Sequence, residues 1–178
     1  MDRKIVEFVE QTAEPRPGDG AAIRQHVAAA SFDHTSRPAA EWAKIGTPLL
    51  GRPHPTTGQP IQSDTLLSSL EAHVAKRIHE ERWAANTTPT EYLSDLRLAA
   101  ANAVRVKVGL RDEGPLASTT TPDSLLLTAS TKYRRGAGRH LFVVYNARKR
   151  AIVSGYSEPE PFIANLHRAW KKLRIIPL

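Results

Sequence analysis

Apolar residues near the middle of the chain fall on one side of a helix. They are Leu66, Leu67, Leu70, Val74 and Ile78. This period predicts a helix from Asp64 to about Glu80, with Ser63 or Asp64 as its N-cap. A second helix is predicted from Thr88-Pro-Thr-Glu91, because threonine is a good N-cap, proline suits the first turn and Glu91 completes a capping box. It should run to about Ala103 and bury Tyr92, Leu93, Leu96, Ala99 and Ala100.

Beyond residue 103 the pattern changes to alternation. Valine and leucine alternate with arginine, lysine and glycine over residues 104–110, which predicts a half-buried strand. Further strands are predicted at 124–130, 140–146 and 151–156. The last two are separated by Ala-Arg-Lys-Arg at 147–150, so they should form a β-hairpin with a basic tip. Phe162, Leu166, Trp170 and Leu173 then predict a terminal helix.

This order of elements predicts an α+β fold, in which helices pack on a C-terminal antiparallel sheet of about four strands and a helix ends the chain. The first part of the chain has a weaker pattern. Short helices are expected at 3–10 and 20–30, and the proline- and glycine-rich residues 35–63 are expected to form an extended connector with one helical turn around Trp42. We therefore expect an N-terminal extension over residues 1–63 and one domain over 64–178.

Composition narrows the class of protein. The absence of cysteine excludes disulfides, thiolate catalysis and zinc-finger sites, and it fits a cytoplasmic protein. No apolar run approaches the length of a membrane helix, so no membrane partner is expected. Residues 131–178 carry 11 Lys/Arg against Glu158 and Glu160, a net charge of +9, whereas residues 1–130 carry a net charge of −2. Such a basic segment indicates a surface for a polyanion, with RNA as the expected ligand, although basic residues can also simply be solvated.

RNA can be cleaved without a metal because its own 2′-OH is the nucleophile. The protein must then supply a base, an acid and cations. His73 and Arg77 fall together at the edge of the apolar stripe of the first helix, and His79 falls on the opposite side if the helix extends that far. Each could equally be an ordinary surface or core-edge residue. His73 and His79 are six residues apart, which does not match a helical zinc pair, so neither a metal nor another cofactor is expected.

The predicted hairpin adds hydroxyl groups. Ser154 and Tyr156 are two residues apart and should share one strand face, as should Arg150 and Ile152. Hydroxyls flanked by arginines can bind phosphate oxygens. Ordinary cross-strand pairing is the alternative.

Two stretches resemble a known family. The stretch from His73 to His79 with Thr88-Pro-Thr-Glu-Tyr-Leu93, and the stretch from Leu141 to Tyr156, resemble the helical entry and the closing hairpin of small bacterial toxin ribonucleases of the barnase/EndoU/colicin/RelE fold. The resemblance covers about residues 64–160. It implies His79 as the catalytic histidine with His73 second, and it places Ser154 where the family usually has threonine. Ile78 departs from the family pattern, in which the basic residue and the histidine are often adjacent, and the helical periodicity favours His73 instead, so both histidines stay candidates.

The expected function is a metal-independent endoribonuclease, the toxin of a bacterial conflict or toxin–antitoxin system, that cleaves RNA through the 2′-OH. An acidic antitoxin or immunity protein would be its partner. A non-catalytic nucleic-acid-binding regulator or mobile-element protein is the alternative, and a protein-interaction module that uses the terminal helix is a third. The catalytic candidates are His73, Arg77, His79, Ser154 and Tyr156. The nucleic-acid-binding candidates are Lys132, Arg134, Arg135, Arg139, Arg148, Lys149 and Arg150.

Overall fold

The fold is described from a computed structural model that covers residues 2–10, 12–42, 48–111, 124–129, 139–159 and 170–178. It is α+β, with the helices in the first 101 residues. The helices are α1 (Asp2–Val9), α2 (Asp19–Ala28), α3 (Ala39–Trp42), α4 (Ser69–His79) and α5 (Pro89–Ala101). The strands are β1 (Ser36–Pro38), β2 (Leu66–Ser68), β3 (Arg105–Arg111), β4 (Ser124–Ala129), β5 (Arg139–Asn146), β6 (Ala151–Pro159) and β7 (Trp170–Ile176).

The chain divides into two compact units. The first, which we call the sheet unit, comprises residues 1–31 and 95–178, and the second, the helix–loop unit, comprises residues 32–94. The first 31 residues therefore cluster with the sheet.

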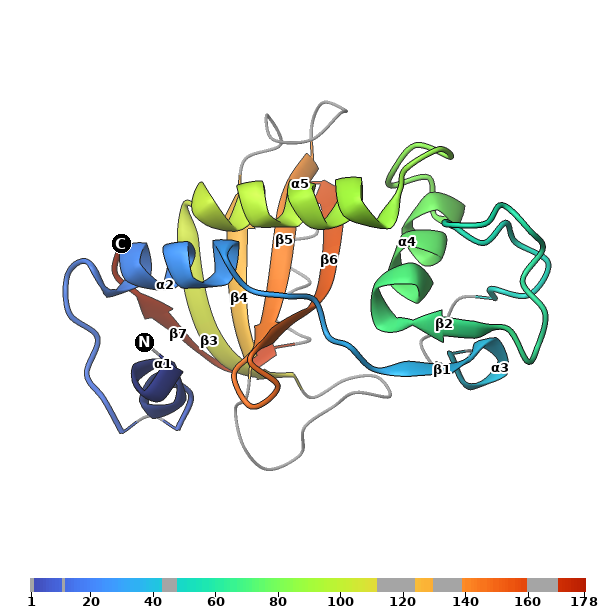
Figure 1. Cartoon of the computed structure of the whole chain (residues 1–178). Coiled ribbons are helices and arrows are strands. Elements are labelled where there is room, and N and C mark those ends of the chain that lie inside the picture. The colour runs from blue at the N-terminus through green and yellow to red at the C-terminus, as the bar shows by residue number, and fades with distance from the viewer. Residues whose placement is uncertain (1, 11, 43–47, 112–123, 130–138, 160–169) are drawn as a thin grey trace. The chain divides into compact units, whose positions relative to one another are not determined.

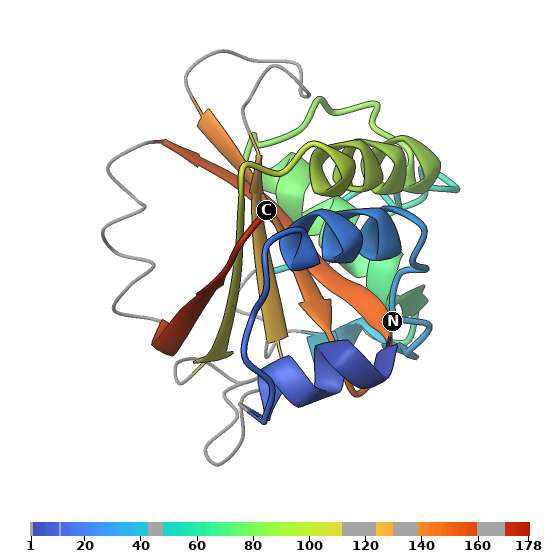
Figure 2. The ribbon, with the colours of Figure 1, turned by 90° about the vertical axis from the view of Figure 1, so that its left-hand side faces the viewer.

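The sheet unit is built on a five-stranded antiparallel sheet with strand order β6-β5-β4-β3-β7. Strands β3 to β6 follow one another as a meander, and the predicted hairpin of β5 and β6 is confirmed. In the views of Figures 1 and 2, α1, α2 and the end of α5 lie on one side of this sheet.

Two arginines tie α2 to α5. Arg24 of α2 donates to the carbonyl of Ala103, just beyond the end of α5, at 2.9 Å. Arg97 of α5 donates to the carbonyl of Ala30, just beyond the end of α2, at 3.0 and 2.8 Å. Each guanidinium thus satisfies a carbonyl that no helical N–H can reach, at the negative end of a helix dipole.

The prediction of a terminal helix is wrong for the part of it that the structure describes. Residues 170–176 form strand β7, which pairs with β3. Their helical spacing was coincidental, because pairing with β3 from Val106 to Arg111, with one irregularity between Val108 and Leu110, satisfies backbone groups of both strands. Phe162 and Leu166 of that predicted helix lie outside the described residues.

In the helix–loop unit, the first long helix begins later than predicted. Residues 66–68 are strand β2, paired with β1, and α4 begins only at Ser69. Ser68 is the N-cap, and with Glu71 it forms a capping box. The pairing with β1 takes Leu66 out of the helix and leaves it 64% exposed, so Leu66 is not part of the apolar stripe. By contrast, α5 begins as predicted, with Glu91 N–H donating to Thr88 Oγ1 at 3.1 Å and Thr88 N–H donating to Glu91 at 2.8 Å.

The predicted connector contributes to a core of its own. The one-turn helix around Trp42 is confirmed as α3. Buried apolar residues of this segment pack with β2 and α4 in one cluster, which consists of Ala39, Trp42, Leu49, Ile61, Leu67, Ala72 and Ala75. Residues 48–63 are therefore a packed loop, not an extended linker.

Candidate nucleic-acid interface and catalytic residues

His73 lies in the core of the helix–loop unit. It is 7% exposed, its Nδ1 donates to the carbonyl of Ser69 at 2.7 Å, and its ring contacts the edges of Phe32 and Trp42. Burial, and secondly the charge of Arg77, lower the pKa of His73 to about 3. With these contacts, the neutral imidazole of His73 can serve to hold the core of this unit together. Because the ring is buried, it presents little surface to a substrate.

Arg77 is also buried in this unit, at 8% exposure. Its Nη1 donates to Glu80 Oε2 at 2.7 Å. Burial acts against the charged form, but Tyr92 and Glu80 outweigh it and raise the pKa of Arg77. Arg77 therefore stays charged, as the buried half of a partly exposed ion pair with Glu80.

His79 is the last residue of α4 and is only half-buried. Its Nε2 lies 3.4 Å from Nη2 of the exposed Arg52. Of the three α4 candidates, His79 alone combines an accessible ring with a neighbouring cation. The structure thus gives His79 better access than His73, although the helical pattern favours His73.

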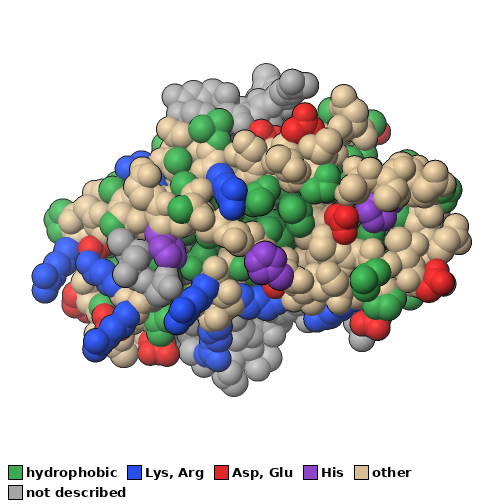
Figure 3. Space-filling model, viewed as in Figure 1, with side chains coloured by type: hydrophobic (Ala, Val, Ile, Leu, Met, Phe, Trp, Pro, Cys, Tyr) green, Lys and Arg blue, Asp and Glu red, His purple; other side chains and the backbone are tan. Residues whose placement is uncertain are grey.

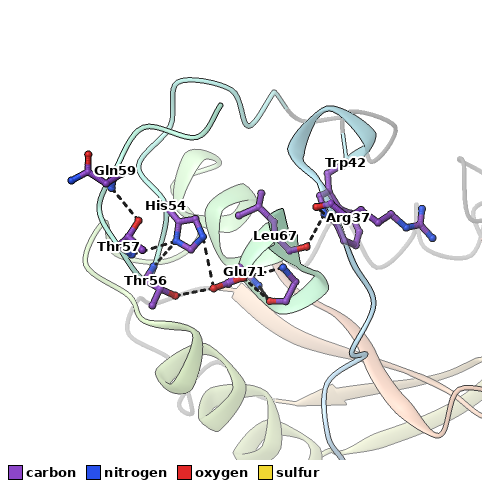
Figure 4. A network of polar contacts seen from close by, with 9 residues as sticks. Arg37, Trp42, His54, Thr56, Thr57, Gln59, Leu67 and Glu71 are labelled. Atoms are coloured by element: carbon purple, nitrogen blue, oxygen red, sulfur yellow. Dashed lines mark hydrogen bonds and ion pairs between the residues drawn. The ribbon is translucent and has the colours of Figure 1, made fainter. Parts of the chain in front are cut away.

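The loop that carries Arg52 is fastened to α4 by a polar network that includes His54 (Figure 4). His54 Nδ1 accepts the backbone N–H groups of Thr56 and Thr57 at 3.1 and 3.3 Å, so its proton lies on Nε2, 3.8 Å from Glu71 Oε1. Burial acts against the Glu71 carboxylate, but hydrogen bonds from Ser68 and Thr56 lower the pKa of Glu71. No sequence motif indicated this network, because its halves are 17 residues apart.

In the sheet unit, packing contacts reveal which side chains point to which face. A Cβ built on Gly155 would lie 2.2 Å from Leu96 Cδ2 of α5, and Tyr145 Oη lies 3.0 Å from His26 Nε2 of α2. Gly155 and Tyr145 therefore point toward the helices. Because neighbouring residues of a strand point to opposite sides, Ser154 and Tyr156 point to the other side, which we call the far face.

The register extends this assignment to neighbouring strands. Val144 pairs with Ser154 and Phe142 pairs with Tyr156, and the Phe142 and Tyr156 rings stack with centroids 5.2 Å apart. The predicted shared face of Ser154 and Tyr156 thus agrees with the register. Ile152 does not share it, because a bulge shifts the register after Val144 and pairs Ile152 with Tyr145 on the helix side.

Three further residues of the far face were not among the predicted site residues. His140 precedes Phe142 by two positions, and the two ring centroids are 6.5 Å apart. Lys107 and Arg105 of β3 lie in the cross-strand rows that end at Ser154 and Tyr156 respectively. Burial, and then the charge of Arg105, lower the pKa of Lys107, which is 8% exposed. The alternation in β3 is visible in the sequence, but its register with β6 is not.

The basic tip of the hairpin is exposed and ordered by Asn146. The Oδ1 of Asn146 accepts the backbone N–H groups of Arg148 and Lys149, each at 3.0 Å, and Arg150 has a φ of 54°. These contacts fix the backbone of the turn while the side chains of residues 148–150 stay exposed. Lys and Arg side chains are visible around this end of the sheet in Figure 3.

The remaining predicted cations are only partly covered by the structure. Arg139 begins β5, and its side chain is not described, while Lys132, Arg134 and Arg135 lie outside the described residues. Over the whole sequence, the sheet unit contains 19 Lys/Arg and 11 Asp/Glu, a net charge of +8, and the helix–loop unit contains 6 and 7, a net charge of −1. The positive charge of the protein is therefore concentrated in the sheet unit.

The part of the chain that the structure describes contains neither a cluster of metal-binding side chains nor a membrane-spanning helix. There, no three His, Asp or Glu side chains gather closely enough to hold a metal ion, and no helix is long and apolar enough to cross a membrane. No family model, curated protein or solved structure matches this chain.

Proposed function

We propose that this protein is an endoribonuclease that binds RNA on the far face of the sheet unit and cleaves it through the 2′-OH without a metal. The observation that carries the proposal is the composition of this face. It brings the hydroxyl groups of Ser154 and Tyr156 onto the same surface as Arg105 and Lys107, in the unit that holds the positive charge.

Electrostatics support RNA as the ligand. The exposed Arg105 and the half-buried Tyr156 are three strand spacings apart in one row, or about 14 Å at the usual separation of strands. A single strand laid across this row would meet a cation at one end and the Tyr156 hydroxyl at the other. The exposed tip of residues 148–150 adds three cations that can hold further phosphates.

The order of elements supports the nuclease class. Helices followed by an antiparallel meander with a closing hairpin are what the resemblance to small toxin ribonucleases implies, and the hairpin half of that resemblance falls in the sheet unit. We extend the proposal on this ground to a toxin role in the cytoplasm and to an acidic antitoxin or immunity protein. Such a partner would inhibit by covering the same cations.

A non-catalytic nucleic-acid-binding protein is the second candidate. It is favoured by one observation, the 8% exposure of both Ser154 and Lys107, because groups with so little accessible surface serve a substrate poorly. This alternative predicts steeply salt-dependent binding through the exposed tip and no product.

The test is cleavage of a 5′-labelled single-stranded RNA by the full chain in EDTA. We expect products that end in a 2′,3′-cyclic phosphate, no cleavage where the 2′-OH is replaced by hydrogen, and at least a tenfold lower rate for Tyr156→Phe. Arg3→Gln removes a cation from the exposed surface of α1 and serves as the control of unchanged rate. Binding without any product would favour the second candidate, and cleavage of the 2′-deoxy substrate would overturn the 2′-OH mechanism.

A further inference from the structure

We propose that His140 is the general base of the far face and that Tyr156 is its general acid. The inference rests on the proposed function and names the residues that perform its chemistry. It is carried by the position of the two rings on either side of Phe142, on neighbouring strands.

The geometry places His140 and Tyr156 within reach of one phosphate. Phe142 pairs directly with Tyr156, and His140 lies two residues before Phe142 on the same face, so His140 and Tyr156 are diagonal neighbours. Side chains in this relation have Cβ atoms about 7 Å apart. A phosphodiester between the two rings could present its 2′-OH to one and its 5′-oxygen to the other.

Phe142 holds the rings of His140 and Tyr156 at this spacing. It is 1% exposed, whereas His140 and Tyr156 are half-buried. Both outer rings contact the buried one, and the stacked geometry of Phe142 and Tyr156, with planes 22° apart, leaves the phenol little rotational freedom. Groups held in this way need little reorganisation when a substrate binds.

His26, His54 and His73 are less suited to this role. Within the described part of the sheet unit, the histidines are His26 and His140, and His26 points to the helix side, where its Nε2 lies 3.0 Å from Tyr145 Oη. In the helix–loop unit, His73 and His54 are buried and engaged by hydrogen bonds. On the far face, as far as the structure describes it, His140 is the histidine, and its half-buried ring lies beside Phe142.

The proposed step balances as an in-line transesterification. A nitrogen of His140 takes the proton of the 2′-OH while the 2′-oxygen forms a bond to phosphorus. The bond from phosphorus to the 5′-oxygen breaks, and that oxygen takes the phenolic proton of Tyr156. The products are a 2′,3′-cyclic phosphate and a 5′-OH, and a later proton exchange returns both side chains to their starting forms.

The experiment compares single-turnover cleavage by His140→Asn, Tyr156→Phe and the matched control His34→Asn, which changes an exposed histidine of the other unit. We expect a loss of at least 100-fold for His140→Asn, since general acid–base catalysis typically contributes roughly 10²- to 10⁴-fold. His34→Asn should cleave at the full rate. Binding of a 2′-deoxy RNA analogue and the circular dichroism spectrum should be unchanged in all three variants.

A modified substrate separates the two roles. Where sulfur replaces the bridging 5′-oxygen, the leaving group needs no proton, so Tyr156→Phe should recover most of its rate and His140→Asn should not. Imidazole added to His140→Ala should restore part of the cleavage of ordinary RNA.

The outcomes separate this inference from the proposed function. Absence of cleavage by the unaltered protein overturns the proposed function. Full activity of His140→Asn, with loss of activity in Tyr156→Phe, overturns the present inference alone.

Discussion

Replacement of Gly155 by alanine tests the packing contact from which the two faces of the sheet were assigned. The added Cβ would lie 2.2 and 2.6 Å from the two terminal carbons of Leu96, where carbon atoms normally keep about 3.5–4.0 Å. Leu96 is fully buried, so its side chain cannot withdraw without displacing its neighbours.

The expected loss follows from two opposing effects. Overpacking of this kind typically costs about 1–3 kcal/mol, and alanine recovers about 0.5–1 kcal/mol relative to glycine inside a strand. Gly155→Ala should therefore lower the free energy of unfolding by up to about 2.5 kcal/mol.

A double-mutant cycle with Leu96 shows whether the loss arises at this contact. Leu96→Ala alone should cost about 2–5 kcal/mol, because it opens a cavity beneath β6. In that background the new methyl group of Gly155→Ala occupies the vacated space, so the second substitution should cost nothing or be stabilising. The coupling energy should reach at least 1 kcal/mol.

Urea unfolding of the four proteins, followed by far-ultraviolet circular dichroism, provides the measurement. An unchanged dependence on urea concentration would show that stability alone has changed. Additive losses, within about 0.5 kcal/mol, would refute the reasoning. Gly155 would then not face Leu96, and Ser154 and Tyr156 could not be assigned to the far face.

Three further predictions concern the rest of the molecule. The pKa of His73 is lowered to about 3 in the folded protein. Between about pH 6.5 and pH 3, the His73 ring is therefore protonated in the unfolded chain but neutral in the folded protein. Unfolding free energy should then fall by up to about 1.4 kcal/mol per pH unit between pH 6.5 and 4, with a smaller fall in His73→Phe as measured by urea unfolding at each pH. Arg97→Ala should lower the unfolding free energy by about 1–2 kcal/mol, since it leaves the carbonyl of Ala30 without its charged donor, and Arg3→Ala on the exposed surface should change it by less than about 0.5 kcal/mol. Substitution of Arg148, Lys149 and Arg150 together by glutamine should reduce the slope of log binding constant against log salt by about 2 for single-stranded RNA; an unchanged slope in fluorescence anisotropy would place the phosphates elsewhere.

The helix signals differed in how well they could be interpreted from the sequence. The box at Thr88 and Glu91 predicted the start of α5 correctly because nothing nearby competes with it. The same motif occurs at Ser68 and Glu71, but the helical spacing of Leu66 favours an earlier start at Ser63 or Asp64. Residues 66–68 form a strand because they pair with residues 36–38, so α4 begins only at Ser69. A contact between residues about 30 positions apart leaves no local signal in the sequence.

The terminal strand β7 and the candidate site depend even more than the start of α4 on contacts between residues that are far apart in the sequence. Residues 170–176 carry apolar residues at both spacings, and the neighbouring strand β3 selected the extended form. His140 was not a candidate in the sequence because its immediate neighbours show no motif. Only the register that pairs Phe142 with Tyr156 brings the imidazole next to the phenol.

The sequence by itself determined the properties that depend on near neighbours. These are the α+β order, the start of α5, the hairpin of β5 and β6 with its basic tip, and the concentration of positive charge in residues 131–178. Tertiary structure decided which side chains share a surface, because strand register and the Leu96 contact join residues that are far apart along the chain. It likewise buried His73 and Arg77 in the helix–loop unit and left Tyr156 and His140 half-accessible on the sheet, since periodicity predicts an apolar face but not what packs against it.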